Sequence, residues 1–342
     1  MTGFVRSGAC GVTGFASCST GVPGTLARMI IVLGAVLVAV ALLGIAAHFL
    51  DSTGQLMLVV AALARLLMVW SVPGAVLLGV GVGWWGVVFG SLVVAVAFST
   101  QFPLVRSRLR KRSVQGTPFG VMSANILLGE ADAGALVAAV DTHAPDVLTV
   151  VELTRSAHEG LVAAGILERL PYTFVSPASG GNGTGIYSRY PIGDETRHDG
   201  YITELLSARV QVPDGPWPLV FAVHPVPPWP RHPSSWVREL AALRQLMEKI
   251  PLDDGPVVVS GDFNATFDHK RYRDLLSDRY RDAALEVGAG HLATYSADAW
   301  YPPLIAIDHI LVSDAAVIDV GVVELPGSDH RGIRADLRLR AP

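Results

Sequence analysis

Long apolar runs occupy the first third of the chain. Residues 29–50 contain no Lys, Arg, Asp or Glu, and a second apolar block covers residues 56–98. A helix of about 20 apolar residues crosses a hydrocarbon core of about 30 Å, so the first block predicts one membrane span. The turn signal Ser71–Gly74 divides the second block into two more spans. We therefore expect three transmembrane helices within residues 29–98.

The two later spans, at about 55–72 and 75–98, contain one charged residue, Arg65. A charge inside a membrane span is costly and usually marks a functional site. Because no second charge lies nearby in these spans to form a relay, we expect Arg65 to reach the interface or to find a partner within the small bundle. These spans are therefore interpreted as an anchor rather than as a transporter.

From residue 118 onward, the apolar positions follow the shorter periods of strands and helices. Short apolar runs and alternation predict strands, and helical spacing predicts helices between some of them. The expected strands are 121–127, 146–151, 185–188, 206–212, 219–224, 257–259, 305–312 and 333–339, and the expected helices are 131–143, 155–170 and 236–250. This order is typical of a mixed α/β domain with hairpins rather than of a doubly wound parallel sheet.

Composition and charge also separate the two regions. The chain of 342 residues is 51% hydrophobic but only 16% charged, whereas a soluble globular chain has about 25% charged residues. Residues 1–117 carry a net charge of +7 and residues 118–342 a net charge of −11. This composition excludes a disordered chain, and two cysteines, Cys10 and Cys18, exclude a disulfide scaffold.

We divide the chain into four segments: a disordered tail at 1–28, the three transmembrane helices at 29–98, a basic linker at 99–117 and a folded domain at 118–342. Five Lys and Arg residues between positions 106 and 112 favour the cytoplasmic side for the linker. They outnumber Arg6 and Arg28 ahead of the first span. We therefore expect a multi-pass protein of the cell membrane with its folded domain in the cytoplasm.

Polar side chains recur at or near the ends of the expected strands. They are Asn125, Glu152, His224, Asp262, Asn264, Asp308, Asp329 and His330. Each has a structural explanation by itself, such as a turn or a helix cap. Asp308 is the hardest to explain in this way, because a lone buried carboxylate needs a partner. Since catalytic groups cluster in loops at one edge of a rigid scaffold, the whole set predicts a site.

The chemistry of this set is specific. Carboxylates and amides without thiolates suit a hard cation with oxygen ligands, Mg²⁺ or Mn²⁺, rather than zinc. Histidines suit acid–base work and the stabilisation of anions. A hard cation, a carboxylate base and imidazoles together predict hydrolysis of a phosphate ester.

The motifs that contain these residues resemble the endonuclease/exonuclease/phosphatase superfamily, in the family's order and across residues 123–330. The motifs are Ser123–Ile126, Asp146–Glu152, Gly185–Ile192, Ala222–His224, Gly261–Asn264, Ile307–Leu311 and Ser328–His330. The resemblance implies a metal-dependent, deoxyribonuclease-I-like enzyme. It also implies a four-layer α/β sandwich of two mixed sheets flanked by helices, here preceded by the transmembrane region.

The resemblance also implies roles for these side chains. Glu152 is expected to be the principal metal ligand, assisted by Asn125, with Asp329 supporting the metal or its waters. Asp262 is expected to orient or deprotonate the attacking water, and Asn264 to hold a phosphate oxygen. The imidazoles that contact the phosphoryl group are then expected to be those of His224 and His330, the latter held by Asp308.

The Pro-rich segment 225–233 that follows His224 has two interpretations. It is a stiff connector to the next helix, or it forms a rigid wall beside the site, with Trp229 free to stack on a base or a sugar. The sequence leaves both open.

The charge of the folded domain is the main sequence feature that bears on the substrate. Nucleic-acid binding draws on cationic side chains, but the domain is acidic, and its one basic patch, around Arg271, is flanked by Asp268 and Asp274. We interpret the chain as a membrane-anchored, Mg²⁺-dependent phosphodiesterase, and we expect an endonuclease- or exonuclease-type nuclease, which is the commonest family form. The alternative is a phospholipid or phosphoinositide phosphodiesterase or phosphatase. A catalytically inactive binding module is the non-enzymatic alternative, but no motif lacks its Glu, Asp or His.

Overall fold

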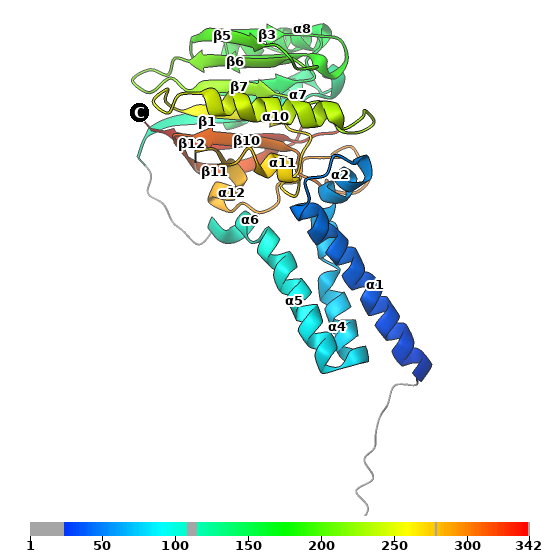
Figure 1. Cartoon of the computed structure of the whole chain (residues 1–342). Helices are drawn as coiled ribbons and strands as arrows, with labels where there is room; N and C mark the ends of the chain where they lie inside the picture. The colour runs from blue at the N-terminus through cyan, green and yellow to red at the C-terminus, as the bar shows by residue number, and fades with distance from the viewer. Residues whose placement is uncertain (1–23, 108–114, 278, 341–342) are drawn as a thin grey trace, which may run out of the picture.

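The computed structural model describes residues 24–107, 115–277 and 279–340 (Figure 1). Most of the expected tail at 1–28, both cysteines and most of the basic cluster at 106–112 lie outside these residues. The helices are α1 (Gly24–Phe49), α2 (Gln55–Ala62), α3 (Ala64–Met68), α4 (Ser71–Val82), α5 (Trp84–Gln101), α6 (Pro103–Arg106), α7 (Ala133–His143), α8 (Arg155–Ala163), α9 (Ile166–Arg169), α10 (Ser234–Lys249), α11 (Lys270–Arg273) and α12 (Ala283–Val287).

Strands of the described residues form two sheets of six. The first sheet has the order β11-β12-β1-β2-β4-β3, and the second has the order β5-β6-β7-β8-β10-β9. Their bounds are β1 (Thr117–Asn125), β2 (Val147–Val151), β3 (Tyr172–Ser176), β4 (Thr184–Ser188), β5 (Ile192–His198), β6 (Leu205–Val210), β7 (Leu219–Val223), β8 (Val257–Asp262), β9 (Arg281–Asp282), β10 (Asp308–Ser313), β11 (Ala315–Val323) and β12 (Gly332–Leu339). Each sheet has one parallel pair at its centre, β1 with β2 and β7 with β8, so both sheets are mixed.

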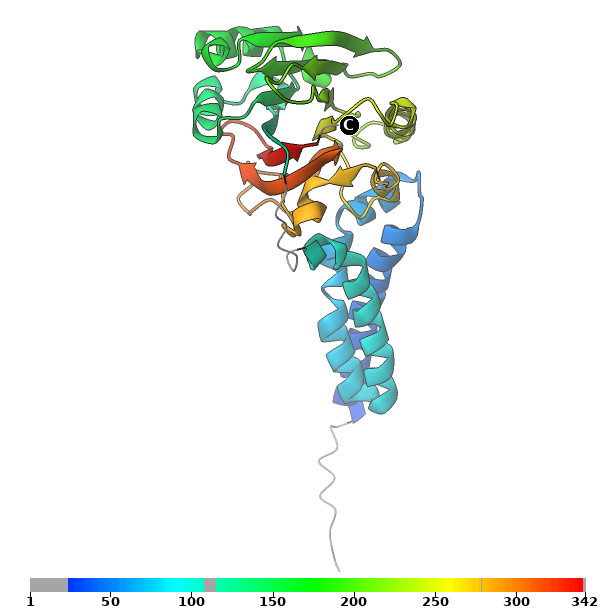
Figure 2. The same cartoon turned by 90° about the vertical axis from the view of Figure 1, so that its left-hand side faces the viewer.

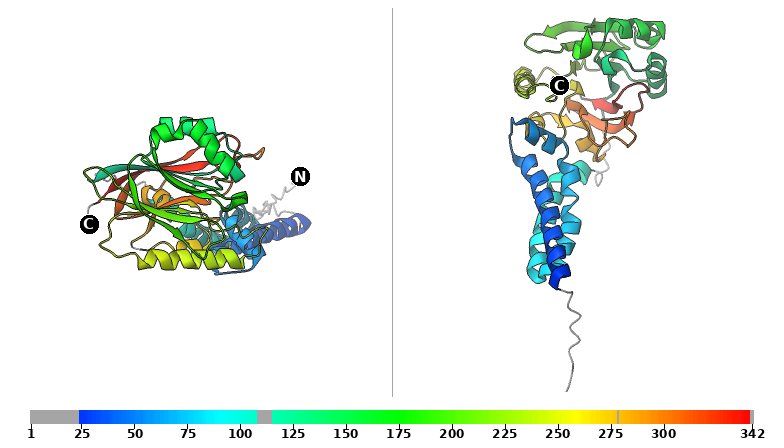
Figure 3. Two further views of the ribbon diagram at one scale, coloured as in Figure 1. Left: turned by 90° about the horizontal axis from the view of Figure 1, so that it is seen from above. Right: turned by 90° about the vertical axis from the view of Figure 1, so that its right-hand side faces the viewer.

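The two sheets pack face to face and helices cover both outer faces (Figure 3, left). Apolar residues such as Val147 of β2 and Val258 of β8 fill the space between the sheets. On the outside, Leu136 of α7 packs on the first sheet, and Trp236 of α10 packs on the second. The expected four-layer α/β sandwich is confirmed.

Helices α1, α4 and α5 form a stem that projects from the sandwich (Figures 1 and 2). Three helical segments of the described residues are long and apolar enough to cross a membrane: Gly24–Phe49, Ala64–Val82 and Trp84–Gln101. Their number agrees with the expectation, and their role as membrane spans stays a prediction.

The turn between the last two segments lies at Gly83, not at Ser71–Gly74 as expected. Gly83 has φ +76°, a conformation that favours glycine. Pro73 is the third residue of α4, where a missing N–H costs little. Gly74 allows α4 to approach α1, since a Cβ there would lie 2.9 Å from the side chain of Val38. Both residues thus serve a continuous helix rather than a turn.

Helix α2, expected to be part of the second span, instead packs against the sandwich at the top of the stem (Figure 1). Leu58 is 5% exposed and belongs to the same hydrophobic cluster as Trp236. The backbone N–H of Thr266 donates to Nδ1 of His269, so Nε2 of His269 donates to the carbonyl of Leu58 at 3.1 Å. Leu63, with φ −97° and ψ 3°, therefore separates a helix bound to the folded domain from the apolar segment that follows it.

Asp268 connects the stem to the loop that follows β8. Its Oδ1 accepts a hydrogen bond from the Gln101 side chain of α5 at 2.9 Å and lies 2.7 Å from Nδ1 of His48 in α1. Nearby, Arg271 pairs with Asp51 at 3.0 Å. These contacts fix the top of the stem on the segment that also contains two predicted site residues.

Candidate active site

The structure brings the eight predicted site residues together around one cleft. The ends of β1, β2 and β8 and the start of β10 meet at the same edge of the sandwich, and Asp262 pairs in register with Asp308. Glu152, His224, Asp262, Asn264, Asp329 and His330 line the cleft. Asn125 and Asp308 are buried directly behind it.

His330 and Asp308 form a buried pair. Nδ1 of His330 lies 2.8 Å from Oδ2 of Asp308, and Nε2 of His330 lies 3.8 Å from Oδ2 of Asp262. Burial by itself lowers the pKa of His330, but the carboxylates of Asp308 and Asp262 outweigh it and raise this pKa to about 10. His330 is therefore a cation at neutral pH, with Nε2 turned toward the cleft.

Asp262 is the most enclosed carboxylate that lines the cleft, at 1% exposure. Its Oδ1 accepts the backbone N–H of Asn264 at 2.7 Å, and its Oδ2 accepts the side-chain amide of Asn125 at 3.1 Å. Burial and the charge of Asp308 raise the pKa of Asp262 to about 6, against the opposing effect of His330. A carboxylate with this pKa suits proton transfer near neutral pH.

Asn125 also orients Glu152. Its Oδ1 accepts the backbone N–H of Leu127, so its amide nitrogen faces the carboxylates and donates to Oε1 of Glu152 at 3.1 Å. Oε2 of Glu152 accepts the N–H of Leu128 at 2.8 Å. Glu152 has φ +60°, which is uncommon for a residue with a side chain and recurs at functional sites. The surrounding bonds hold this carboxylate in place in the lining of the cleft.

His224 faces the same carboxylates from the second sheet. Its Nδ1 lies 3.1 Å from the carbonyl of Gly181, and its Nε2 lies 3.7 Å both from Glu152 Oε1 and from Asp262 Oδ2. The side-chain amide of Asn264 donates to the carbonyl of Pro225 at 3.0 Å. The imidazoles of His224 and His330 and the side-chain amide of Asn125 thus surround Asp262.

Glu152 and Asp329 offer oxygen ligands to a hard cation. Oδ1 of Asp329 is buried and has no hydrogen-bond partner among the described residues, although Nε2 of His330 lies 3.9 Å away. Burial and the like charge of Glu152 raise the pKa of Asp329, against the effect of His330. A divalent cation would give Oδ1 of Asp329 a partner and would reduce the repulsion between Asp329 and Glu152. The residues therefore fit Mg²⁺ or Mn²⁺. Asp262, Asp308 and His330 form another group with ligand atoms within 4.8 Å, but His330 and Asp308 already bond to each other.

Several residues of this cleft, whose volume is about 390 Å³, lie outside the set predicted from the sequence. The ring of Tyr295 lies 5.0 Å from that of His330. Helix α2 contributes a whole wall, including Val59 and Ala62. Neither segment contains a recognisable motif, and α2 has the composition of a membrane span.

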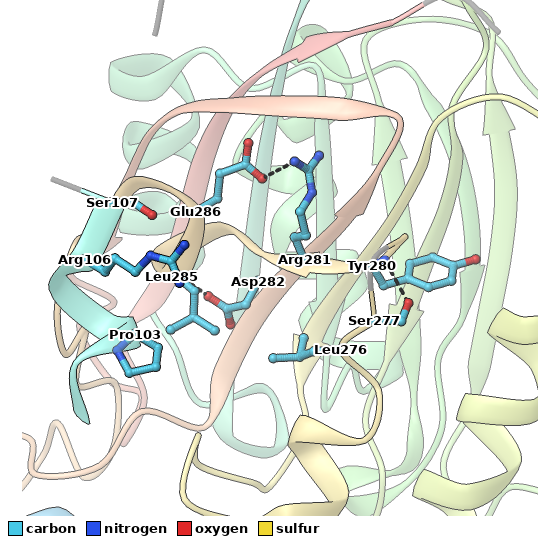
Figure 4. A pocket seen from close by; sticks show the side chains of 10 residues that line it. All are labelled: Pro103, Arg106, Ser107, Leu276, Ser277, Tyr280, Arg281, Asp282, Leu285 and Glu286. Carbon is cyan, nitrogen blue, oxygen red and sulfur yellow. Dashed lines mark hydrogen bonds and ion pairs between the residues drawn. The ribbon is translucent and has the colours of Figure 1, made fainter. Parts of the chain in front are cut away.

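A second cavity, of about 330 Å³, lies where α6 meets α12 (Figure 4). Pro103 and Leu285 line it, and Arg281 forms an ion pair with Glu286 at 3.1 Å. It contains none of the eight predicted site residues.

Residues 122–330 match the model of the endonuclease/exonuclease/phosphatase family. The chain belongs to this family. Its members are metal-dependent hydrolases of phosphate esters, and the chain is therefore an enzyme of that class. No curated protein matches the chain.

Solved structures show the same fold in other family proteins. An endonuclease/exonuclease/phosphatase from Beutenbergia cavernae is 20% identical, with a TM-score of 0.50 over 65% of this chain and 72% of that chain. D. rerio TDP2 complexed with a single-strand DNA product is 16% identical, with a TM-score of 0.52 over 65% of this chain and 99% of that chain. A mannosyl-6-phosphatase from Bacteroides thetaiotaomicron is 18% identical, with a TM-score of 0.50 over 64% of this chain and 99% of that chain. At these identities the likeness shows the fold alone.

Proposed function

We propose that this chain is a membrane-anchored phosphodiesterase that depends on Mg²⁺ or Mn²⁺. The observation that carries the proposal is the buried His330–Asp308 pair, which faces Asp262 across 3.8 Å. A fixed imidazolium beside a carboxylate with a pKa of about 6 supplies both charge stabilisation and a base.

The proposed roles follow from this geometry. Asp262 accepts the proton of the attacking water, because its raised pKa allows it to be a base near neutral pH. His330 and His224 turn their Nε2 atoms toward the developing charge on the phosphoryl oxygens, and Asn264 holds one of these oxygens.

Glu152 and Asp329 are proposed to hold the cation, with Asn125 fixing the Glu152 carboxylate in place. When bound, the cation polarises the phosphoryl group as a Lewis acid. The buried Oδ1 of Asp329, which has no hydrogen-bond partner among the described residues, supports this assignment.

The three apolar helical segments are proposed to anchor the enzyme in the cell membrane. The five positive charges between residues 106 and 112 favour the cytoplasmic side for the catalytic domain.

The substrate has two candidates with different support. D. rerio TDP2, which has this fold, is complexed with a single-strand DNA product, and this favours a nuclease. The acidic domain, with a net charge of −11, and the apolar wall of the cleft favour a phospholipid instead.

The proposal is tested with the full chain in detergent micelles. The substrate is bis(p-nitrophenyl) phosphate, a simple phosphodiester whose hydrolysis does not require recognition of a particular natural leaving group. We expect hydrolysis with Mg²⁺ or Mn²⁺ and none in EDTA, restored when the metal is added back. Full activity in EDTA would contradict the proposed metal dependence.

A further inference from the structure

One wall of the catalytic cleft comes from the apolar N-terminal block. Helix α2 and the residue that follows it supply Leu58, Val59, Ala62 and Leu63 to the lining. The family match begins at residue 122. This wall is therefore an addition to the part of the chain that the family shares, and it lies against the catalytic residues.

The cleft combines a charged floor with apolar sides. Glu152, Asp262, Asp329 and the two histidines form the floor, whereas α2 faces further apolar residues that include Trp229 and Ile305. Among the described residues that line the cleft, none is Lys or Arg. A nucleic acid would bring further phosphates without cations to neutralise them. A ligand with one phosphodiester and a long apolar part fits both surfaces.

The wall formed by α2 and Leu63 continues directly into the stem. Leu63 lines the cleft, and the apolar segment that begins at the next residue, Ala64, is long enough to cross a membrane. A hydrocarbon chain that lies along α2 therefore continues toward the proposed bilayer rather than into water.

Contacts with the sandwich hold α2 in this position. Leu58 is buried in the core beneath α10, and His269 donates to its carbonyl at 3.1 Å. The side-chain amide of Gln55 lies 3.4 Å from the carbonyls of Pro228 and Arg231, on either side of Trp229. The two apolar sides of the cleft are therefore fixed relative to each other and to the floor.

We propose that α2 and Leu63 form a binding wall for the hydrocarbon part of a membrane phospholipid whose phosphodiester is hydrolysed on the cleft floor. This inference rests on the proposed phosphodiesterase function and adds the substrate class. Water attacks phosphorus, one P–O ester bond breaks, one proton passes to Asp262, and the leaving alkoxide takes up a proton. The products are an alcohol and a phosphate monoester.

The test uses the full chain in mixed micelles with Mg²⁺. The lipid substrates are phosphatidylcholine, phosphatidylethanolamine and sphingomyelin. Glycerophosphocholine, which has a phosphodiester headgroup but no hydrocarbon chains, is the comparison compound. A single-stranded oligodeoxynucleotide and bis(p-nitrophenyl) phosphate complete the set. We expect kcat/KM for at least one lipid to exceed that for glycerophosphocholine by about tenfold or more, because several methylene groups are transferred out of water.

Variants of α2 separate a binding wall from a merely structural helix. Val59 is 42% exposed, and Val59→Gln should lower the ratio of lipid to bis(p-nitrophenyl) phosphate hydrolysis by about tenfold. Leu63→Gln should lower it similarly. Leu56→Gln is the matched control, because Leu56 belongs to the same helix, is 78% exposed and does not line the cleft. Thermal unfolding of each variant establishes that the fold is kept.

The outcomes are distinguishable. Hydrolysis of bis(p-nitrophenyl) phosphate with no preference for any lipid over glycerophosphocholine overturns this inference and leaves the proposed function intact. A preference for the oligodeoxynucleotide, or equal effects of Leu56→Gln and Val59→Gln on the ratio, also overturns it. If no phosphodiester is hydrolysed, both proposals fall.

Discussion

Nδ1 of His330 lies 2.8 Å from Oδ2 of Asp308, and both side chains are buried beside the cleft. Asp308 begins β10 of the second sheet, whereas His330 belongs to the loop before β12 of the first sheet. The pair therefore connects the two sheets at the catalytic edge. A carboxylate on Nδ1 fixes the direction of the ring, so Nε2 faces the cleft.

We predict that this pair acts as one unit. His330→Ala and Asp308→Ala should each lower kcat by about 10²-fold or more, within the range for a positioned acid–base group. The double variant should be little worse than the poorer single variant, because either change disables the same imidazolium. Activity on bis(p-nitrophenyl) phosphate is measured beside the melting temperature of each variant. Losses that multiply in folded protein would mean that the residues act independently.

The pH dependence of activity should have two limbs. Asp262 must be deprotonated to accept a proton, so kcat/KM should rise as pH passes its pKa of about 6, or somewhat lower when a cation stabilises the carboxylate. His330 must be protonated, so activity should fall as pH approaches its pKa of about 10. Both limbs belong to the coupled cluster rather than to isolated groups.

Asp308→Asn tests the assignment of the alkaline limb. It removes the carboxylate that raises the pKa of His330, so the alkaline limb should move to lower pH while the residual activity stays measurable. An alkaline limb at the same pH in Asp308→Asn would show that another group is responsible for it.

The sequence predicted most of the site because its polar residues interrupt or terminate apolar runs. Asp308 is the clearest example, since a charge at the start of a buried strand has no packing explanation. The division of the strands into two sheets came from the family resemblance, because local patterns do not specify which strands are neighbours. Strand β5 was missed because its residues, Ile192–His198, are mostly polar and exposed at a sheet edge.

The position of helix α2 against the folded domain could not be predicted from its sequence. Its residues pack partly on a protein core and partly line a cleft, and both environments select the same apolar side chains as lipid does. Composition therefore could not separate Gln55–Ala62 from the apolar segment that begins at Ala64. The expected helix 155–170 likewise ends early, because Gly165 adopts φ +89° between α8 and α9.

The metal assignment is tested by binding as well as by activity. Glu152→Gln should weaken Mn²⁺ binding, measured by electron paramagnetic resonance, by about tenfold or more, because it removes one charged oxygen ligand. Glu159→Gln is the matched control, since Glu159 is exposed on α8. Unchanged Mn²⁺ affinity in Glu152→Gln would place the cation elsewhere, and the group of Asp262, Asp308 and His330 would be the next candidate.

The orientation in the membrane is tested with a C-terminal alkaline phosphatase fusion to the full chain. The positive charges at 106–112 should keep the catalytic domain in the cytoplasm, so the fusion should be inactive there. A C-terminal green fluorescent protein fusion, expected to fluoresce, is the complementary control. An active phosphatase fusion would show that Arg6 and Arg28 dominate the orientation.

The last prediction concerns how firmly the stem is joined to the catalytic domain. Asp268 is 4% exposed and has close contacts with His48 and Gln101 from two helices of the stem. Removing a shared buried acceptor costs about 1–3 kcal/mol for each buried group that is left without a partner. Asp268→Ala should therefore lower the melting temperature in detergent by about 5 °C or more.

Asp274→Ala is the matched control for Asp268→Ala. Asp274 pairs with Lys270 where both side chains are partly exposed, at 31% and 40%, and such a surface pair contributes at most about 1 kcal/mol. Asp268→Ala should also lower the lipid-to-bis(p-nitrophenyl) phosphate ratio, because α2 is held by the same loop through His269. Equal melting temperatures for Asp268→Ala and Asp274→Ala would mean that the stem and the sandwich are joined through other contacts, and that α2 does not depend on Asp268 for its place in the cleft.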